Sequence, residues 1–290
     1  MPIDKLINIL VTITLVELMV AIGLGVTFAK VIGVARNRRL LVHSALANYV
    51  CVPAAAVGLL LLFHVEPMVA AGFLIAAVCP GAPYGPPFTA IAKGDVAVSV
   101  GLMVVLAGSS ALVSPLLLSV LLPLTTGSDS LAVDAAKVIV TLLATQLLPL
   151  CLGLTVRQLR PSLAARLLKP ANLLSTVLNV SVIGLILVVH FPTLMAIRPR
   201  GFLGMLALVL AALAAGWLLG MPGSGNRKAM AITTSVRNVG VGLVIATSSF
   251  PGTPAVTATL AFALFQTVVL ALVALGWGRM APAAAASLSS

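Results

Sequence analysis

Residues 79–87 read Cys-Pro-Gly-Ala-Pro-Tyr-Gly-Pro-Pro and lie inside an apolar stretch, residues 68–92, that is long enough to cross a membrane. Four prolines and two glycines in this segment exclude a continuous helix, because proline lacks an N–H and collides with the preceding turn. Unwound backbone at membrane depth is stable only where protein or a water-lined cavity satisfies its amides. The segment therefore predicts a broken membrane helix packed inside the protein.

The composition of the whole chain agrees with a membrane location. Of the 290 residues, 61% are hydrophobic and 8% are charged, against about 25% charged in an ordinary soluble domain. Six acidic residues cannot cover a water-facing surface of this size, so a soluble protein is excluded and the lipid bilayer is the expected surrounding. Apolar runs predict nine spans, at residues 6–33, 40–63, 68–92, 96–122, 132–156, 171–191, 201–221, 227–249 and 255–278.

A second span is interrupted in the same way. Residues 227–249 contain the polar run Thr-Thr-Ser-Val-Arg-Asn-Val-Gly at positions 233–240. Because this eighth span and the third are an odd number of crossings apart, they run in opposite directions through the bilayer. Two antiparallel broken helices indicate an inverted repeat with a site near the membrane midplane.

The basic residues record topology. The net charge of +11 would suggest nucleic acid in a soluble chain, but here Lys and Arg are scattered between apolar runs, so no nucleic-acid partner is expected. With the N-terminus outside, twelve of them lie inside and four outside, and the one left over is Arg237, which lies inside the eighth span. We predict an integral protein of the cell inner (plasma) membrane with an outer N-terminus and a cytoplasmic C-terminus.

Arg237 is the most informative residue. A charge near the bilayer centre costs at least about 2.5–3.5 kcal/mol, so it is normally paired or functional. Two interpretations are open, and both can hold at once. Arg237 presents a fixed positive charge to an anionic substrate, or it is tied to backbone carbonyls exposed at the break.

Glu17 is the one acid well inside a span. It is a proton-coupling carboxylate, a partner that neutralises Arg237, or a solvated group at a cavity mouth. Asp95 follows Gly94 at the start of the fourth span, where a carboxylate caps a helix. Cys51, Cys79 and Cys151 have no metal-ligand spacing, and neither do the three histidines, so no metal or other cofactor is predicted.

The sequence contains no catalytic motif and no phosphate-binding Walker loop, so an enzyme and an ATP-driven pump are both disfavoured. A secondary transporter is the class that remains. The anion that it carries and its oligomeric state do not follow from the sequence.

Three segments resemble the bile acid:sodium symporter family, and the resemblance extends over nearly the whole chain. They are Pro80 to Thr89 with the following Ala92 to Val100, Thr233 to Gly240, and Asn48-Tyr49-Val50-Cys51-Val52-Pro53. The resemblance implies an all-α polytopic fold of nine helices, with a core domain, a panel domain and substrate bound between them. It implies alternating access by movement of one domain against the other.

The implied domain boundaries follow the spans. Residues 1–35 form a panel helix, 36–122 the first half of the core, 123–195 the panel helices, and 196–280 the second half of the core. Residues 281–290, small and polar, are predicted to be a disordered tail.

The resemblance also implies site residues. Asn48 matches an amide of a sodium site, Asn238 matches the crossover asparagine of the family, and Thr267 falls where a substrate-contacting asparagine usually lies. The candidate substrate-binding residues are Pro83, Tyr84, Gly85, Thr233, Ser235, Arg237, Asn238 and Thr267, and the coupling candidates are Glu17 and Asn48.

The chain departs from the family pattern where sodium binds. Gly85-Pro86 replaces Ser-Asn, Thr233 replaces a glutamate, and Arg237 replaces a glutamine. The hydroxyl ligands of the fourth span align near Ala107 and Ala111. Sodium needs oxygen ligands and nearby negative charge, and a guanidinium would repel it. Sodium is therefore disfavoured as a cofactor.

We predict a secondary transporter of a small organic anion in which Arg237 does the electrostatic work of sodium. Such a carrier would be coupled to protons, or would work as a uniporter or an exchanger. Two alternatives stay open. One is an arsenite-type metalloid efflux permease with Cys79 as ligand, and the other is a membrane sensor or scaffold that does not transport.

Overall fold

The computed structural model describes residues 3–126, 131, 133–195 and 197–280, and within them the protein is all helical. Eight helical segments of the described residues are long and apolar enough to cross a membrane, and the third predicted span, residues 68–92, is occupied by two shorter helices, α5 (Pro67–Val78) and α6 (Gly85–Ile91). The predicted fold, an all-α polytopic membrane protein, is confirmed. The predicted disordered tail, residues 281–290, lies outside the described residues.

The helices are α1 (Ile3–Gly25), α2 (Phe28–Arg36), α3 (Arg38–Leu46), α4 (Val52–Phe63), α5 (Pro67–Val78), α6 (Gly85–Ile91), α7 (Val96–Thr126), α8 (Ala135–Leu142), α9 (Leu148–Leu159), α10 (Pro161–Val189), α11 (Phe191–Met195), α12 (Pro199–Leu218), α13 (Ser224–Ser235), α14 (Val239–Ser249) and α15 (Pro254–Met280).

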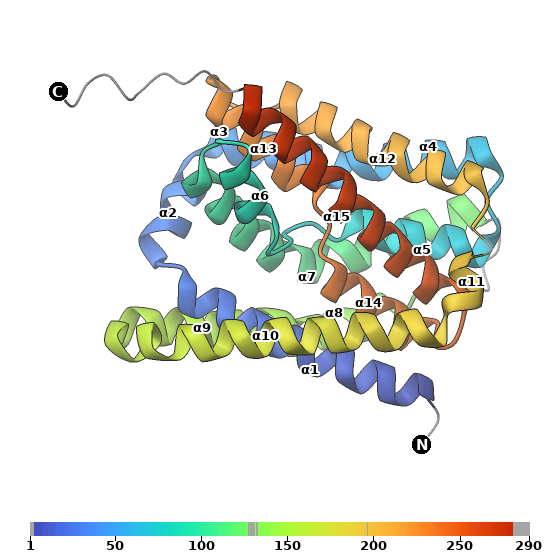
Figure 1. The fold of residues 1–290 in the computed structure, drawn as a ribbon, viewed down its shortest axis with the longest axis horizontal. Helices are drawn as coiled ribbons and strands as arrows, with labels where there is room; N and C mark the ends of the chain where they lie inside the picture. The colour runs from blue at the N-terminus through green and yellow to red at the C-terminus, as the bar shows by residue number, and fades with distance from the viewer. Residues whose placement is uncertain (1–2, 127–130, 132, 196, 281–290) are drawn as a thin grey trace.

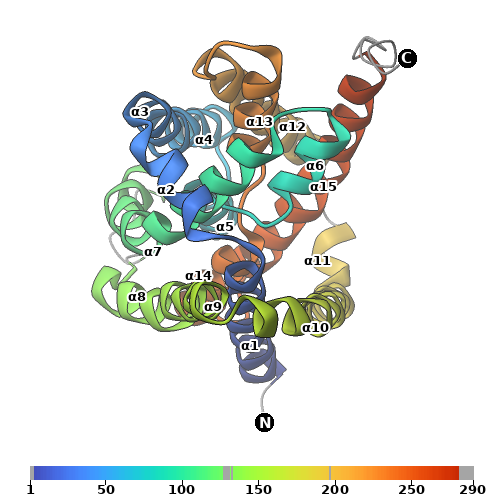
Figure 2. The same ribbon diagram turned by 90° about the vertical axis from the view of Figure 1, so that its left-hand side faces the viewer.

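The helices form two layers (Figures 1 and 2). In the lower layer of Figure 1, α1 packs mainly against α9 and α10. In the larger upper layer, α5 packs on α7 and α15, and α13 packs on α6, α7 and α12. Helix α1 also contacts α14, so the two layers meet near the broken helices.

Glycines bring α1 and α9 into backbone contact. A Cβ atom on Gly23 would lie 2.5 Å from the Leu150 carbonyl oxygen, and one on Gly153 would lie 2.4 Å from that of Val20. Neither distance is possible for a real side chain, so these positions require glycine. Close packing of this kind is the usual way in which membrane helices associate.

The first predicted span is wrong at its C-terminal end. We expected one helix over residues 6–33, but α1 ends at Gly25 and α2 is a separate helix. Thr27 lies between them in an extended conformation, with φ −95° and ψ 146°. Glycine and a β-branched threonine favour this break. Because α2 packs mainly against α7, the single helix expected over residues 1–35 is divided between the two layers.

The sixth span is longer than predicted. Helix α10 begins at Pro161, ten residues before the expected start at residue 171, and continues through Pro170. Residues 162–169 consist mostly of Ala, Leu, Arg and Lys, which favour helix strongly enough to extend it past the proline.

Two spans contain a π-helical turn, at Ala47–Cys51 between α3 and α4 and at Leu143–Leu147 between α8 and α9. Each turn lies just before a proline, Pro53 or Pro149, whose missing N–H and bulky ring disturb a regular helix. Each turn also holds a fully buried amide, Asn48 or Gln146. The widened turn thus directs a polar side chain into the protein interior.

Candidate functional site

The two broken helices meet where both are unwound. Helix α5 ends at Val78 and α6 begins at Gly85, while α13 ends at Ser235 and α14 begins at Val239. The backbone N–H of Asn238 donates to the Cys79 carbonyl at 2.7 Å. These segments, far apart in sequence, satisfy one another's backbone groups, as unwound backbone in a membrane requires.

Asn238 joins the breaks a second time with its side chain. Its Nδ2 donates to the Gly81 carbonyl at 3.2 Å, and its Oδ1 accepts from the Val241 N–H at 3.3 Å, which caps α14. The amide therefore acts both as a helix cap and as a link between the two crossing helices.

Asn238→Ala is expected to lower the free energy of unfolding by about 1–3 kcal/mol, because the cap and the link to Gly81 are both lost. Asn238→Ser is the matched control, since serine can cap α14 but cannot reach Gly81, and we expect a smaller loss. Thermal unfolding in detergent measures both. Equal stability of Asn238→Ala and the wild type would contradict this role.

The guanidinium of Arg237 is buried in the same place, and the residue is only 2% exposed. One terminal nitrogen donates to the Ala77 carbonyl at 2.7 Å. The other donates to Asn48 Oδ1 and to the Thr234 carbonyl, both at 2.5 Å. All three acceptors are neutral oxygens, and the Nε has no partner within the described part of the chain.

Two of these acceptors lie in the last turns of α5 and α13, the half-helices that precede the breaks. Carbonyls at a helix C-terminus carry the negative end of the helix dipole. The guanidinium thus occupies a position that suits a cation. This arrangement matches the interpretation of an arginine tied to carbonyls at the break.

Gln266 of α15 holds the unwound peptide of Arg237. Its Oε1 accepts from the Arg237 N–H and its Nε2 donates to the Arg237 carbonyl, both at 3.1 Å. On this helix the family resemblance implies a substrate-contacting role for Thr267, not for Gln266. The structure instead places the adjacent amide at the break.

A chain of three buried hydroxyls lies beside Gly85. Thr89 donates to Ser99 at 3.0 Å, and Ser99 is 2.9 Å from the Thr233 hydroxyl. A Cβ atom on Gly85 would be 3.7 Å from Ser99 and from Thr233. The hydroxyl of α7 that faces these residues is therefore Ser99. Ala107, one of the two positions aligned with the hydroxyl ligands, packs against Gly81 instead.

The remaining predicted residues lie in different places. Ser235 is buried and donates back to the Ala231 carbonyl of its own helix, whereas Tyr84 is 41% exposed. Thr267 is exposed and donates to the Ala263 carbonyl. Glu17 accepts a hydrogen bond from Ser175 of α10 and does not pair with Arg237.

A cavity of about 300 Å³ lies between the two layers. Its walls come from α1, α2, α6, α7 and α10, together with residues of the first break. Pro83 and Pro86 line it on one side, and Asn172 of α10 lines it on another. Lys30 of α2 also lines it and is the one charged residue in its wall.

Arg237 does not line this cavity, so Lys30 is the cation that faces it. Sequence reasoning missed Lys30 because that residue was counted only as a topology signal. Its place next to the break between α1 and α2 is the signal that could have drawn attention to it.

Known proteins are similar to this chain in sequence. The sequence profile of the "Sodium Bile acid symporter family" matches residues 12–198 of the chain. The chain is also 23% identical over 276 residues to "Uncharacterized sodium-dependent transporter YocS" of Bacillus subtilis (strain 168), which covers 93% of this chain and 83% of that protein. The match covers both the first broken helix and the cavity-lining segments. The chain therefore belongs to the sodium bile acid symporter family, whose members are membrane transporters.

Proposed function

We propose that this protein is a secondary transporter of a small organic anion that does not need sodium, because Arg237 is a cation built into its crossing site. The observation that carries the proposal is the set of oxygens around the guanidinium, from Ala77, Thr234 and Asn48. Half-helix C-termini and unwound carbonyls are the groups with which secondary transporters coordinate sodium.

The electrostatics favour the same conclusion. A sodium ion at these oxygens would lie within a few ångströms of the guanidinium, and two like charges 4 Å apart repel by about 4 kcal/mol at an effective dielectric constant of 20. The region beside Gly85, where the family resemblance implies a second sodium site, holds Thr89, Ser99 and Thr233, which bond to one another and supply no negative charge.

The cavity between the layers is the proposed substrate site. Its volume of about 300 Å³ lies at the small end of ligand pockets, which favours a small anion over a steroid conjugate. Lys30 provides the positive charge for that anion. The layer around α5, α7 and α13 acts as the core domain, the layer of α1, α9 and α10 acts as the panel, and their relative movement gives alternating access.

Lys30→Gln is expected to raise the KM for the transported anion about tenfold, since a lost charge contact of about 1.4 kcal/mol changes affinity by that factor. Arg36→Gln removes one charge from the same helix at an exposed position outside the cavity, so it is the matched control. Uptake by proteoliposomes measures both. An equal change in the two variants would show that surface charge, not the cavity, is responsible.

The proposal is tested by uptake of a keto acid, a sulfonate and a steroid conjugate into proteoliposomes. We expect uptake of at least one anion at the same rate with sodium and with potassium outside. A proton gradient is applied to the wild type and to Glu17→Gln, because Glu17 is the coupling candidate. Uptake that requires a sodium gradient would contradict the proposal. If the proton gradient accelerates uptake by the wild type but not by Glu17→Gln, the carrier is coupled to protons.

The basic residues support an outer N-terminus and a cytoplasmic C-terminus in the plasma membrane. Lys30 belongs to the inner group, so the cavity between the layers would open toward the cytoplasm. Cysteine labelling at engineered positions in intact cells tests this orientation.

Two other functions have less support. Cys79, the proposed ligand of a metalloid permease, is fully buried, and its carbonyl is occupied by Asn238. Unchanged transport by Cys79→Ser would remove that candidate. A sensor or scaffold would bind and transport no anion, so Lys30→Gln would have no effect on anion uptake.

A further inference from the structure

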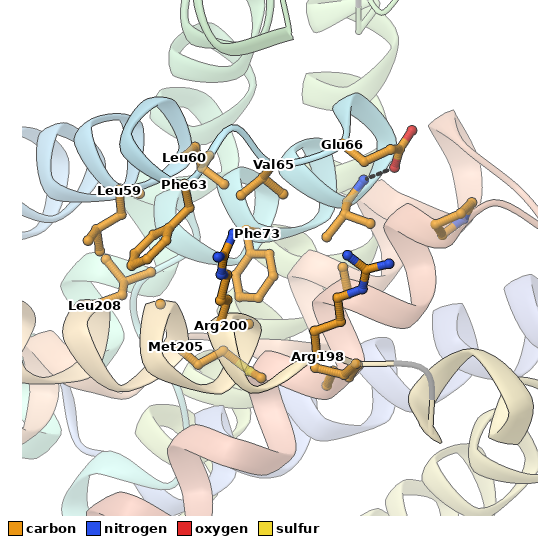
Figure 3. A pocket seen from close by; sticks show the side chains of 18 of the residues that line it. Leu59, Leu60, Phe63, Val65, Glu66, Phe73, Arg198, Arg200, Met205 and Leu208 are labelled. Atoms are coloured by element: carbon orange, nitrogen blue, oxygen red, sulfur yellow. Dashed lines mark hydrogen bonds between the residues drawn. The ribbon is translucent and has the colours of Figure 1, made fainter.

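A second cavity, of about 470 Å³, is lined by α4, α5, α12 and α15 (Figure 3). It lies away from the crossing of the two broken helices. Its walls are apolar and aromatic side chains, among them Leu60, Phe63, Phe73, Met205 and Leu208. It shares no lining residue with the cavity between the layers. The proposed transport site therefore does not account for it.

The mouth of this cavity lies at one face of the membrane. Helix α4 ends at Phe63, while α5, α12 and α15 begin at Pro67, Pro199 and Pro254, and residues next to all four ends line the cavity. Ends of membrane helices lie near the lipid headgroups, so the apolar walls extend from that level toward the hydrocarbon. A cavity that is open at the headgroup level and apolar below it suits a ligand with one polar end and one apolar end.

Two arginines lie at the mouth. Arg198 is the N-cap of α12, and Arg200 follows in its first turn. Both line the cavity and are exposed, and within the described residues neither forms an ion pair. Figure 3 shows the Arg200 side chain extending across the mouth toward α4 and α5, with Arg198 beside it.

The one acid at the mouth offsets only one of these two charges. Glu66 accepts the Val69 N–H at 3.0 Å and thereby caps α5. The N-terminal ends of α12 and α15 add partial positive charge at the same level, which the C-terminal end of α4 offsets in part. The mouth therefore has a net positive potential directly above apolar walls.

The flanks of the cavity face lipid. Leu61 and Leu62 on α4 are 52% and 69% exposed, and Phe202 and Leu203 on α12 are 45% and 56% exposed. Apolar side chains this exposed on membrane-spanning helices contact acyl chains. Two of the helices that form the cavity walls are therefore in contact with the surrounding lipid.

We propose that this cavity binds an acidic phospholipid of the surrounding membrane, with its phosphate at Arg198 and Arg200 and an acyl chain along Phe63, Phe73 and Leu208. Basic pockets between membrane helices are suited to anionic headgroups, and arginine pairs well with phosphate. A water-soluble anion would leave the apolar walls uncovered. The lipid stabilises the ends of α4, α5, α12 and α15 relative to one another.

The experiment adds phosphatidylglycerol or phosphatidylcholine to the purified full chain in detergent and measures Tm, with native mass spectrometry to count retained lipid. Phosphatidylglycerol is expected to raise Tm by about 5 °C more than phosphatidylcholine does. The double variant Arg198→Gln/Arg200→Gln should lose this difference.

A matched control is Lys5→Gln/Lys137→Gln. It removes the same charge from two exposed lysines that the charge pattern assigns to the same side of the membrane, far from the cavity in sequence, and it should keep the lipid effect. A second variant, Gly204→Leu, keeps both arginines. A Cβ on Gly204 would lie 3.8 Å from Phe63, so leucine extends into the cavity and should weaken lipid retention.

Several outcomes would overturn the proposal. Equal stabilisation by the two lipids would show that the arginines do not recognise a headgroup. Full stabilisation by glycerol 3-phosphate would assign the site to a soluble anion. If the lysine control lost as much of the Tm difference between the two lipids as the arginine variant does, the effect would be due to general surface charge. Every variant leaves Lys30 and Arg237 unchanged. Failure of the lipid proposal can therefore be told apart from failure of the transport proposal, which is tested by uptake.

Discussion

Arg237→Gln is expected to be stabilised by sodium, whereas the wild type is expected not to be. In potassium the variant should lose about 3 kcal/mol of stability, because the oxygens of Asn48, Ala77 and Thr234 stay buried without their donor. For a chain of this size the loss corresponds to a fall in Tm of roughly 5–10 °C. Sodium should restore part of it, because the vacated oxygens can then coordinate the ion.

Thermal unfolding of the wild type and the variant in matched sodium and potassium buffers measures the effect. Arg279→Gln removes an exposed arginine at the end of α15 and should behave like the wild type in both salts. A wild type that sodium stabilises would contradict a built-in cation. So would an Arg237→Gln variant that is as stable in potassium as the wild type.

Gly81→Ala is expected to have the largest effect on folding. Gly81 has φ +83°, which disfavours any residue with a Cβ, and that Cβ would lie 2.3 Å from the backbone nitrogen of Ala107. Strain and overlap together are expected to cost about 3–5 kcal/mol, since the surrounding helices cannot move apart without opening the crossing. The folded fraction after extraction should fall severely, as size-exclusion chromatography would show.

Gly184→Ala provides the contrast. A Cβ on Gly184 would meet nothing within 4 Å, and the residue lies inside α10. The same substitution there should be neutral or stabilise by up to about 1 kcal/mol. If Gly81→Ala were tolerated as well as Gly184→Ala, the close approach of α7 to the first break would not be required for folding.

The two breaks could be predicted because their cause is local. Proline and glycine at 79–87 exclude helix regardless of what surrounds them, and the polar run at 233–240 cannot face lipid. Their opposite directions follow from counting crossings. The sequence therefore predicts both the crossing and the buried position of Arg237.

The partners of the crossing could not be predicted as well, because they depend on how each helix is rotated. Adjacent residues on a helix point about 100° apart, so a shift of one residue separates Gln266, which holds the Arg237 peptide, from the exposed Thr267. The rotation of α7 likewise decides that Ser99, and not Ala107, faces the hydroxyls of Thr89 and Thr233. Lys30 was missed because it depends on the end of α1, and helix ends are difficult to predict.

A cation that is part of the chain also changes how the membrane voltage acts on the carrier. A bound sodium ion can dissociate before the empty protein returns, whereas in the proposed mechanism Arg237 would stay with the crossing helices in every step. Any part of the electric field through which those helices move acts on its charge, at about 2.3 kcal/mol per elementary charge and 100 mV for the full field. In the proposed carrier a bound monovalent anion offsets one positive charge of the moving unit, and without the anion that charge is not offset. An inside-negative potential would therefore act mainly on the empty carrier and favour its cytoplasm-facing state, so that uptake currents and voltage dependence would report on the return step.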